Sequence, residues 1–238
     1  MKKILFIAFV LFVNDSFGQF KVPKIKLPTS TVAKTTGLTE SDIANGLKEA
    51  LSIGAKKASE QLNQLDGFNA NSLVRIPFPE DMQKVAKELR NLGYGQKVDE
   101  FELSLNRSAE EAAKEAAPIF VNSIKQMSIT DAKSILTGPD TAATGYLRKT
   151  TYTPLYNAFS PHVNTALQNN FAASKWSEIT SIYNKIPFVK KVDTDLIRYT
   201  TNKALKGVFI LVAQQELKIR KDPAAQVTDL LKKVFGKK

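Results

Sequence analysis

The sequence predicts an all-α fold: a single compact domain of about seven to nine helices that follows a cleaved signal peptide and a short basic linker. Three observations lead to this prediction. From Leu38 onward, apolar residues recur every three or four positions, turn signals separate these repeats, and no two segments alternate like paired strands. Because no internal repeat or long linker divides residues 38–236, we expect one helical domain over residues 38–238.

Residues 1–18 have the layout of a secretory signal peptide. A basic start precedes an apolar run over residues 4–13, and Ser16-Phe17-Gly18 places small residues at the two positions that signal peptidase recognises. The less favoured alternative is a membrane anchor, but spanning a bilayer core takes about 20 apolar residues. We therefore expect export to the periplasm or envelope, with cleavage near Gly18.

Residues 19–37 are expected to form a basic, flexible linker. They contain two prolines, a polar Thr29-Ser30-Thr31 run, and four lysines: Lys21, Lys24, Lys26 and Lys34. The alternation over residues 24–27 leaves open a short strand that pairs with a partner.

The first predicted helix covers residues 39–65. Thr39 followed by Asp42 has the spacing of a capping box. One face of this helix carries a small-residue stripe, defined as Gly46, Ala50, Gly54 and Ala58. A glycine inside a helix costs about 1 kcal/mol relative to alanine, so the stripe indicates that another backbone packs closely there. The alternative is that the glycines are merely tolerated.

The middle of the chain is expected to alternate extended and helical segments. The prolines of residues 74–79 favour an extended stretch, and helices follow over residues 80–92 and 98–127. Gly93 and Gly95 should end the former helix, and Pro118 should kink or divide the latter. Thr130-Asp131 begins a short helix that stops at Gly138-Pro139-Asp140.

In the last part of the chain, the apolar pattern predicts helices over residues 141–151, 154–169, 172–185 and 193–221, followed by a short amphipathic tail helix. Asp222-Pro223 ends the long helix. Its expected inner face consists of Leu196, Tyr199, Leu205, Val208, Val212 and Leu217. The tail helix would present Leu230, Leu231, Val234 and Phe235.

Composition excludes many kinds of chemistry. The chain has no cysteine and one histidine, His162, so disulfides, thiolate sites and the usual histidine zinc sites are excluded. It also lacks a phosphate-binding loop, a dinucleotide fingerprint and a nucleophile elbow. We expect no cofactor and no metal, and we assign no catalytic residue. His162, which follows Pro161, is expected to be a surface or capping residue.

The chain is strongly basic. Its net charge is +11, and loss of Lys2, Lys3 and Asp15 with the signal peptide leaves +10. Of the 34 basic residues only six are arginine, the residue favoured for nucleic-acid readout. We therefore expect no nucleic-acid partner, and instead solubility or weak contact with anionic envelope surfaces.

Three polar sets are candidate sites. In the first, Asn106 and Glu110 share a helix face near Arg107. The second is a helix N-terminus, which serves as an anion site or simply as a cap, and comprises Asp140, Thr141, Thr144 and Arg148. The third is the pair Glu216 and Arg220, with Arg198 or Asp140 as further partners. Whether these sets converge in one pocket or form separate structural clamps is left open.

Several of these stretches together resemble the bacterial family catalogued as domain of unknown function 4197. The resemblance rests on residues 105–113, 138–147, 216–220, 223 and 228–236, with support from Asp66-Gly67-Phe68 and Val74-Arg75-Ile76-Pro77. It extends over nearly all of residues 38–236. It implies an exported, mostly helical bacterial protein, and it transfers no catalytic residue.

The favoured functional hypothesis is a non-enzymatic envelope module that binds an unknown protein partner or an apolar ligand. One alternative is an enzyme that uses Glu110, Asp140 or Glu216 as general acid or base while Arg107, Arg148 or Arg198 holds an anion. Another is peripheral attachment to anionic membrane through the lysines of residues 21–34 and 232–238. The sequence leaves the oligomeric state open.

Overall fold

The computed structural model describes residues 39–79, 82–185, 195–226, 228–229, 232 and 234. The chain divides into the units Met1–Thr36 and Gly37–Lys238, and every described residue belongs to the second. The expected signal peptide and linker lie outside the described residues, as do Leu230, Leu231 and Phe235 of the expected tail helix.

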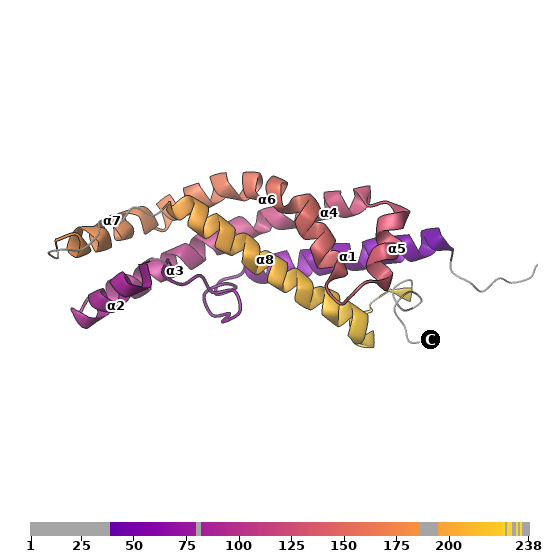
Figure 1. Ribbon diagram of the computed structural model, residues 1–238, viewed down its shortest axis with the longest axis horizontal. Helices are drawn as coiled ribbons and strands as arrows, with labels where there is room; N and C mark the ends of the chain where they lie inside the picture. The colour runs from indigo at the N-terminus through magenta and orange to yellow at the C-terminus, as the bar shows by residue number, and fades with distance from the viewer. Residues whose placement is uncertain are drawn as a thin grey trace, which may run out of the picture. The chain divides into compact units, whose positions relative to one another are not determined.

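The described part of the chain is all-α, as the sequence predicts (Figure 1). In chain order its helices are α1 (Glu40–Leu62), α2 (Gln83–Asn91), α3 (Gly95–Ala112), α4 (Ala116–Gln126), α5 (Ile129–Thr137), α6 (Ala142–Asn169), α7 (Ala172–Tyr183) and α8 (Leu196–Lys221). Two short 3-10 turns are η2 (Ala113–Glu115) and η3 (Pro223–Ala225).

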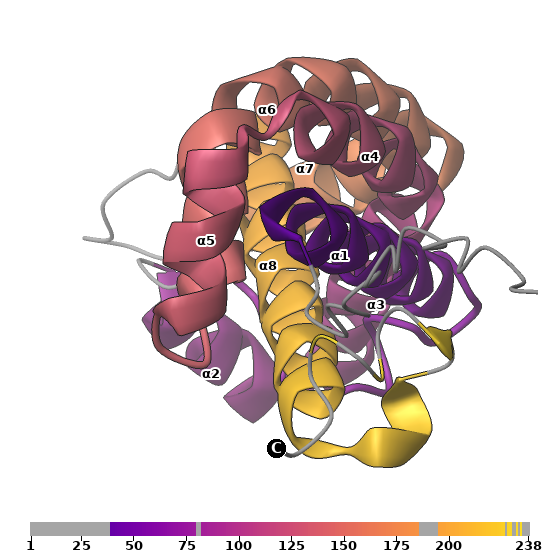
Figure 2. The same cartoon turned by 90° about the vertical axis from the view of Figure 1, so that its right-hand side faces the viewer.

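Helix α1 occupies a central position, where it packs against α4, α5 and α8 (Figure 2). All four residues of the small-residue stripe are buried. A Cβ placed on Gly54 would lie 3.2 Å from Cβ of Gln215 and 3.4 Å from Cδ1 of Ile219. The stripe therefore lets α8 approach α1 closely at this point, as the sequence predicts.

Two helices begin with complete capping boxes. The Thr39 hydroxyl accepts from the backbone of Asp42, whose carboxylate accepts from the backbone of Thr39. At α5 the same reciprocal pair is formed by Ser128 and Asp131. The sequence-based start at Thr130-Asp131 was therefore placed too late, because Ser128 caps the helix and Asp131 is its third residue.

Pro118 divides the long helix predicted over residues 98–127. The division lies at η2, one turn before the proline, between α3 and α4. A proline ring clashes with the carbonyl four residues earlier, here that of Lys114 in the centre of η2. Tightening to a 3-10 turn relieves that clash while both helices keep a common buried face.

The two helices predicted on either side of residues 152–153 are one helix, α6, with Pro154 and Pro161 inside it. An internal proline costs about 3 kcal/mol. The fully buried Leu147, Leu155 and Phe159 form a continuous inner face, and α6 packs along α8 and α3. This packing maintains the helix through both prolines. His162 consequently lies on an exposed face inside a helix and not at a helix start.

One residue of the predicted inner face of α8, Leu217, was placed wrongly. Leu205, Val208 and Val212 are buried, and Leu196 and Tyr199 are partly buried. Leu217, however, is 41% exposed, whereas the neighbouring Glu216 is only 3% exposed. A charged residue occupies the buried position that the apolar pattern assigned to Leu217.

An aromatic cluster joins α3, α7 and the stretch before α2, at the end of the helical unit opposite α5 (Figure 1). The ring of Phe101 lies 5.2 Å from that of Phe78 and 5.0 Å from that of Trp176, measured between centroids. Phe78 belongs to the extended stretch predicted over residues 74–79, so the cluster also fixes that stretch. Among the described helices, none is both long and apolar enough to cross a membrane.

Two adjacent buried hydroxyls on α8 generate a stability prediction. The hydroxyls of Thr200 and Thr201 have no hydrogen-bond partner within the described part of the chain, although both residues are fully buried. We expect Thr201→Val to raise the free energy of unfolding by about 1 kcal/mol, because it removes an unsatisfied polar group without changing shape. Urea denaturation measures this effect.

Thr151→Val is the matched control, because the equally buried hydroxyl of Thr151 donates to the carbonyl of Leu147. This control should give no such gain. A loss of stability in Thr201→Val as large as that in Thr151→Val would contradict the prediction.

Candidate functional site

The predicted polar residues do not meet in one place. Two buried clusters form, one around Glu216 and one around Glu110, and they share no residue. Asp140, Arg148 and Arg198 belong to neither cluster. Each cluster can therefore be judged separately by what its side chains contact.

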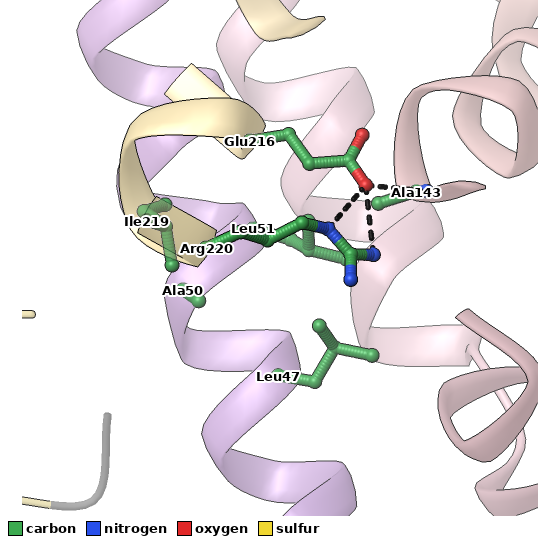
Figure 3. A pocket seen from close by; sticks show the side chains of 7 residues that line it. All are labelled: Leu47, Ala50, Leu51, Ala143, Glu216, Ile219 and Arg220. Atoms are coloured by element: carbon green, nitrogen blue, oxygen red, sulfur yellow. Dashed lines mark hydrogen bonds and ion pairs between the residues drawn. The ribbon is translucent and has the colours of Figure 1, made fainter. Parts of the chain in front are cut away.

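The Glu216 cluster joins α8 to the N-terminus of α6 (Figure 3). Carboxylate oxygen Oε1 accepts from the backbone N–H of Ala143 at 3.0 Å and from Nε and Nη2 of Arg220 at 3.0 and 2.9 Å. Oxygen Oε2 accepts from the N–H of Thr144 at 2.9 Å and from its hydroxyl at 2.8 Å. Both oxygens are therefore fully engaged.

Glu216 acts as the cap of α6, although it lies more than 70 residues away in sequence. Thr141, which precedes the helix, makes no side-chain capping bond, and Asp140 is exposed and pairs with Lys221 at 2.6 Å. Free N–H groups and the helix dipole attract an anion to a helix N-terminus. The protein itself supplies that anion.

Arg220 extends the Glu216 cluster to α5. Its Nη2 donates to the carbonyl of Ile135 at 2.8 Å, and its Nη1 reaches the carbonyl of Leu136 at 3.4 Å. The last carbonyls of a helix lack intrahelical partners, so a cation satisfies them well. One ion pair thus ties together the end of α5, the start of α6 and the last turns of α8.

The cavity beside this ion pair is too small for a ligand. Its volume is about 10 Å³, and apolar side chains of α1, including Leu47 and Leu51, form much of its wall (Figure 3). That space is close to the minimum for a single water molecule.

The Glu110 cluster holds the loop that follows α1. Oε1 of Glu110 accepts from the backbone N–H groups of Phe68 and Asn69, both at 3.1 Å, and Oε2 accepts from Arg107 at 2.7 Å. Arg107 also contacts Asp66 at 2.9 Å, where the chain turns with φ = 65°. Hydrogen bonds from Asn69 and Arg107 hold the pKa of Asp66 below its ordinary value.

Asn106 clamps the extended stretch in the way a neighbouring strand would. Its side-chain oxygen accepts from the N–H of Ile76 at 2.8 Å, and its amide nitrogen donates to the carbonyl of Ile76 at 2.8 Å. The same nitrogen donates to the carbonyl of Glu102 at 2.7 Å. Every hydrogen-bonding group of this buried amide is used in holding backbone.

The remaining predicted site residues are exposed. The Arg148 guanidinium lies 5.1 Å from the centre of the Phe209 ring, a cation–π contact. The Arg198 side chain is 70% exposed and lies 3.9 Å from Asp195, which caps α8. His162 lies 3.7 Å from Glu115. None of these contacts gathers an acid, a base and an anion holder around a common space.

A hollow that the sequence did not predict lies between α4 and α6. It has a volume of about 270 Å³, and its lining is Ile119, Asn122, Ser123, Gln126, Tyr146, Thr150, Thr151 and Pro154. We call it the α4–α6 hollow. None of its lining residues carries a formal charge. The spacing of Asn122 and Gln126 on one helix was the signal available in the sequence.

Metal ligands do not cluster in the described part of the chain, where no three histidine, cysteine, aspartate or glutamate residues could hold an ion together. In each buried carboxylate cluster, arginine and backbone donors surround the oxygens. That environment is typical of a carboxylate whose role is to stabilise the fold.

Residues 37–236 match the model of the family described as "Protein of unknown function (DUF4197)", so the chain belongs to that family. No curated protein and no solved structure gives a significant match. The resemblance inferred from residues 105–113, 138–147, 216–220, 223 and 228–236 is therefore confirmed.

The Glu216 cluster predicts a large stability loss on mutation. Glu216→Ala would leave Arg220 buried without its counter-ion and two N–H groups of α6 without acceptors. We expect the free energy of unfolding, measured by urea denaturation, to fall by about 3–5 kcal/mol.

Asp140→Ala is the matched control. It removes an exposed carboxylate near the same helix end, and we expect a change of at most about 1 kcal/mol. If both variants lost the same small amount, Glu216 would not be the constraint described above.

Proposed function

We propose that this DUF4197 member is an exported, non-catalytic helical module that binds its ligand in the α4–α6 hollow. The main support for the proposal is a contrast between two kinds of polar group, those that already have hydrogen-bond partners and those that can still accept or donate to a ligand. The buried carboxylates Glu110 and Glu216 are fully engaged with backbone and arginine, whereas Asn122 and Gln126 in the hollow are exposed amides.

Available amides in a concave surface support binding. Neither amide makes a side-chain hydrogen bond to any described residue, and the two are four residues apart on α4, so they project from the same face. A volume of about 270 Å³ lies just below the usual range of small-molecule sites, which begins at about 300 Å³. The hollow therefore suits a small ligand or part of a larger one.

The character of the hollow favours a polar, uncharged ligand over the apolar ligand that the sequence suggested. Five of its residues carry side-chain amides or aliphatic hydroxyls: Asn122, Ser123, Gln126, Thr150 and Thr151. The hydroxyls of Thr150 and Thr151 already donate to helix carbonyls, but an apolar ligand would leave the amides of Asn122 and Gln126 without partners, which is unfavourable.

Export is supported by the basic, apolar and small-residue pattern of residues 1–18. The alternative of anionic membrane binding depends on the lysine-rich segment 21–34 and the tail 232–238, most of which lie outside the described residues.

Filling the hollow tests the proposed site. The purified full chain is dialysed against a polar small-molecule extract of the cell envelope, and the retained compounds are identified by mass spectrometry. We expect the wild type to retain a compound in chemically unchanged form. Ser123→Phe should abolish retention, because its ring would occupy the hollow.

Ser181→Phe is the matched control, since it adds the same ring to an exposed position of α7 and should leave retention intact. Retention that is equal in all three proteins, or retention of nothing, would contradict the hollow as the binding site. Recovery of a chemically altered compound would contradict the non-catalytic part of the proposal.

The export prediction is independent of the hollow. A chain tagged at its C-terminus should be recovered outside the cytoplasm, and N-terminal sequencing should begin at Gln19. A matched chain with residues 2–18 deleted should remain cytoplasmic. Recovery of the full chain in the cytoplasm with Met1 retained would rule out the proposed export.

A further inference from the structure

The α4–α6 hollow contains a hydroxyl relay that fixes which of its groups can accept hydrogen bonds. The Thr150 hydroxyl lies 3.0 Å from the Ser123 hydroxyl and 3.0 Å from the carbonyl of Tyr146. A carbonyl only accepts, so the single hydrogen of Thr150 points to Tyr146. Ser123 must then donate to Thr150, and its remaining lone pairs stay available as acceptors.

Pro154 leaves a second acceptor beside this relay. Inside a helix, the carbonyl of Thr150 would normally receive the N–H of residue 154, but proline has none. Thr150, Ser123 and Pro154 all line the hollow. The region where α4 and α6 meet therefore has two oxygen atoms that can only accept.

Two amides and an apolar wall complete the chemistry of the hollow. The amides of Asn122 and Gln126 each offer both donors and an acceptor. Burial and the nearby Asp131 raise the pKa of the Tyr146 phenol above its ordinary value. Ile119, Pro154 and the Tyr146 ring supply apolar surface.

We infer that the α4–α6 hollow binds a neutral saccharide, such as one or two residues of an uncharged glycan. Adjacent hydroxyls on a sugar ring present two neighbouring donors to Ser123 and Thr150, and each hydroxyl also accepts from the side-chain amides. An extended peptide presents its N–H donors with carbonyl acceptors between them, which fits two neighbouring acceptors less well. The C–H face of the sugar packs against the apolar wall.

The absence of charge in the lining excludes ionic recognition at this place. In a chain with 34 lysine and arginine residues, an acidic glycan would find counter-charges on many other surfaces but none among the residues of the hollow. Selectivity for neutral over acidic sugars is therefore a direct consequence of the inference, which rests on the proposed binding function of the same site.

The experiment is a titration of the isotope-labelled full chain, followed by amide NMR, with four defined probes. These are triacetylchitotriose, maltotriose, trigalacturonate and a neutral Gly-Ser tetrapeptide with blocked ends. We expect at least one neutral trisaccharide to shift the signals of residues 119–126 and 146–154 with saturation, and trigalacturonate to produce no such shift. Asn122→Ala/Gln126→Ala should raise the Kd about tenfold or more.

Three variants control this measurement. Gln168→Ala removes an exposed amide of α6 outside the hollow and should leave the Kd unchanged. Thr150→Ser keeps the relay hydroxyl and should bind like the wild type, whereas Thr150→Val removes it and should weaken binding about fivefold or more. Unfolding curves of the variants separate a loss of binding from a loss of folding.

The outcomes distinguish the saccharide inference from the proposed function. Saturable shifts in the hollow by the tetrapeptide alone would overturn the saccharide inference and leave the binding function standing. Equal binding of trigalacturonate and the neutral sugars would also overturn the inference. If no probe shifts the hollow while dialysis against extract still retains a compound that Ser123→Phe loses, only the saccharide class is wrong. If both experiments fail, the binding function falls as well.

Discussion

The arrangement of α5, α6 and α8 depends on the hydrogen bonds and the ion pair that the buried carboxylate of Glu216 makes. A helix N-terminus leaves N–H groups without partners, and burying them unsatisfied would cost about 1–3 kcal/mol each. Glu216 accepts two of those groups, and Arg220 uses its remaining donors on the last carbonyls of α5. The first turn of α6, with Ala143 and Thr144, can therefore be buried against α8. Without this ion pair, close packing of α8 on α1 at Gly54 would bring two open helix ends into the core.

The same constraint explains the first half of the chain. The loop after α1 and the stretch before α2 form no regular structure that would pair their backbone groups. Glu110 and Asn106, one turn apart on α3, satisfy them from the side. Arg107 neutralises Glu110 and reaches Asp66 at the turn. The buried polar side chains thus lie where backbone groups lack hydrogen-bond partners of their own. This distribution is why residues that look like a catalytic set in sequence form separate clamps in the structure.

Features that depend on residues close together in the sequence could be predicted, whereas features that depend on distant residues could not. The cap formed by Thr39 and Asp42, the division near Pro118 and the break at Gly138 depend on residues within four positions of each other, and all three were predicted. The cap of α6 is contributed by a residue 73 positions away, so no local pattern identifies it. For the same reason Leu217 was assigned to the core in place of Glu216. The continuity of α6 across residues 152–153 and Pro154 was also missed, because it depends on packing of Leu155 and Phe159 against other helices, which outweighs a local signal to stop.

The proline that misled the local prediction for α6, Pro154, also lines the α4–α6 hollow. A helix interrupted by a stop at Pro154 would satisfy its last carbonyls with water or a cap, as helix ends do. A helix that continues through Pro154 instead retains one carbonyl, that of Thr150, without its N–H partner. Such a group is acceptable only where something outside the helix can donate to it. Thr150 lines the uncharged α4–α6 hollow, so the residue that carries this carbonyl lies beside the proposed binding site. Tertiary packing that maintains α6 therefore brings a helix irregularity and the hollow together.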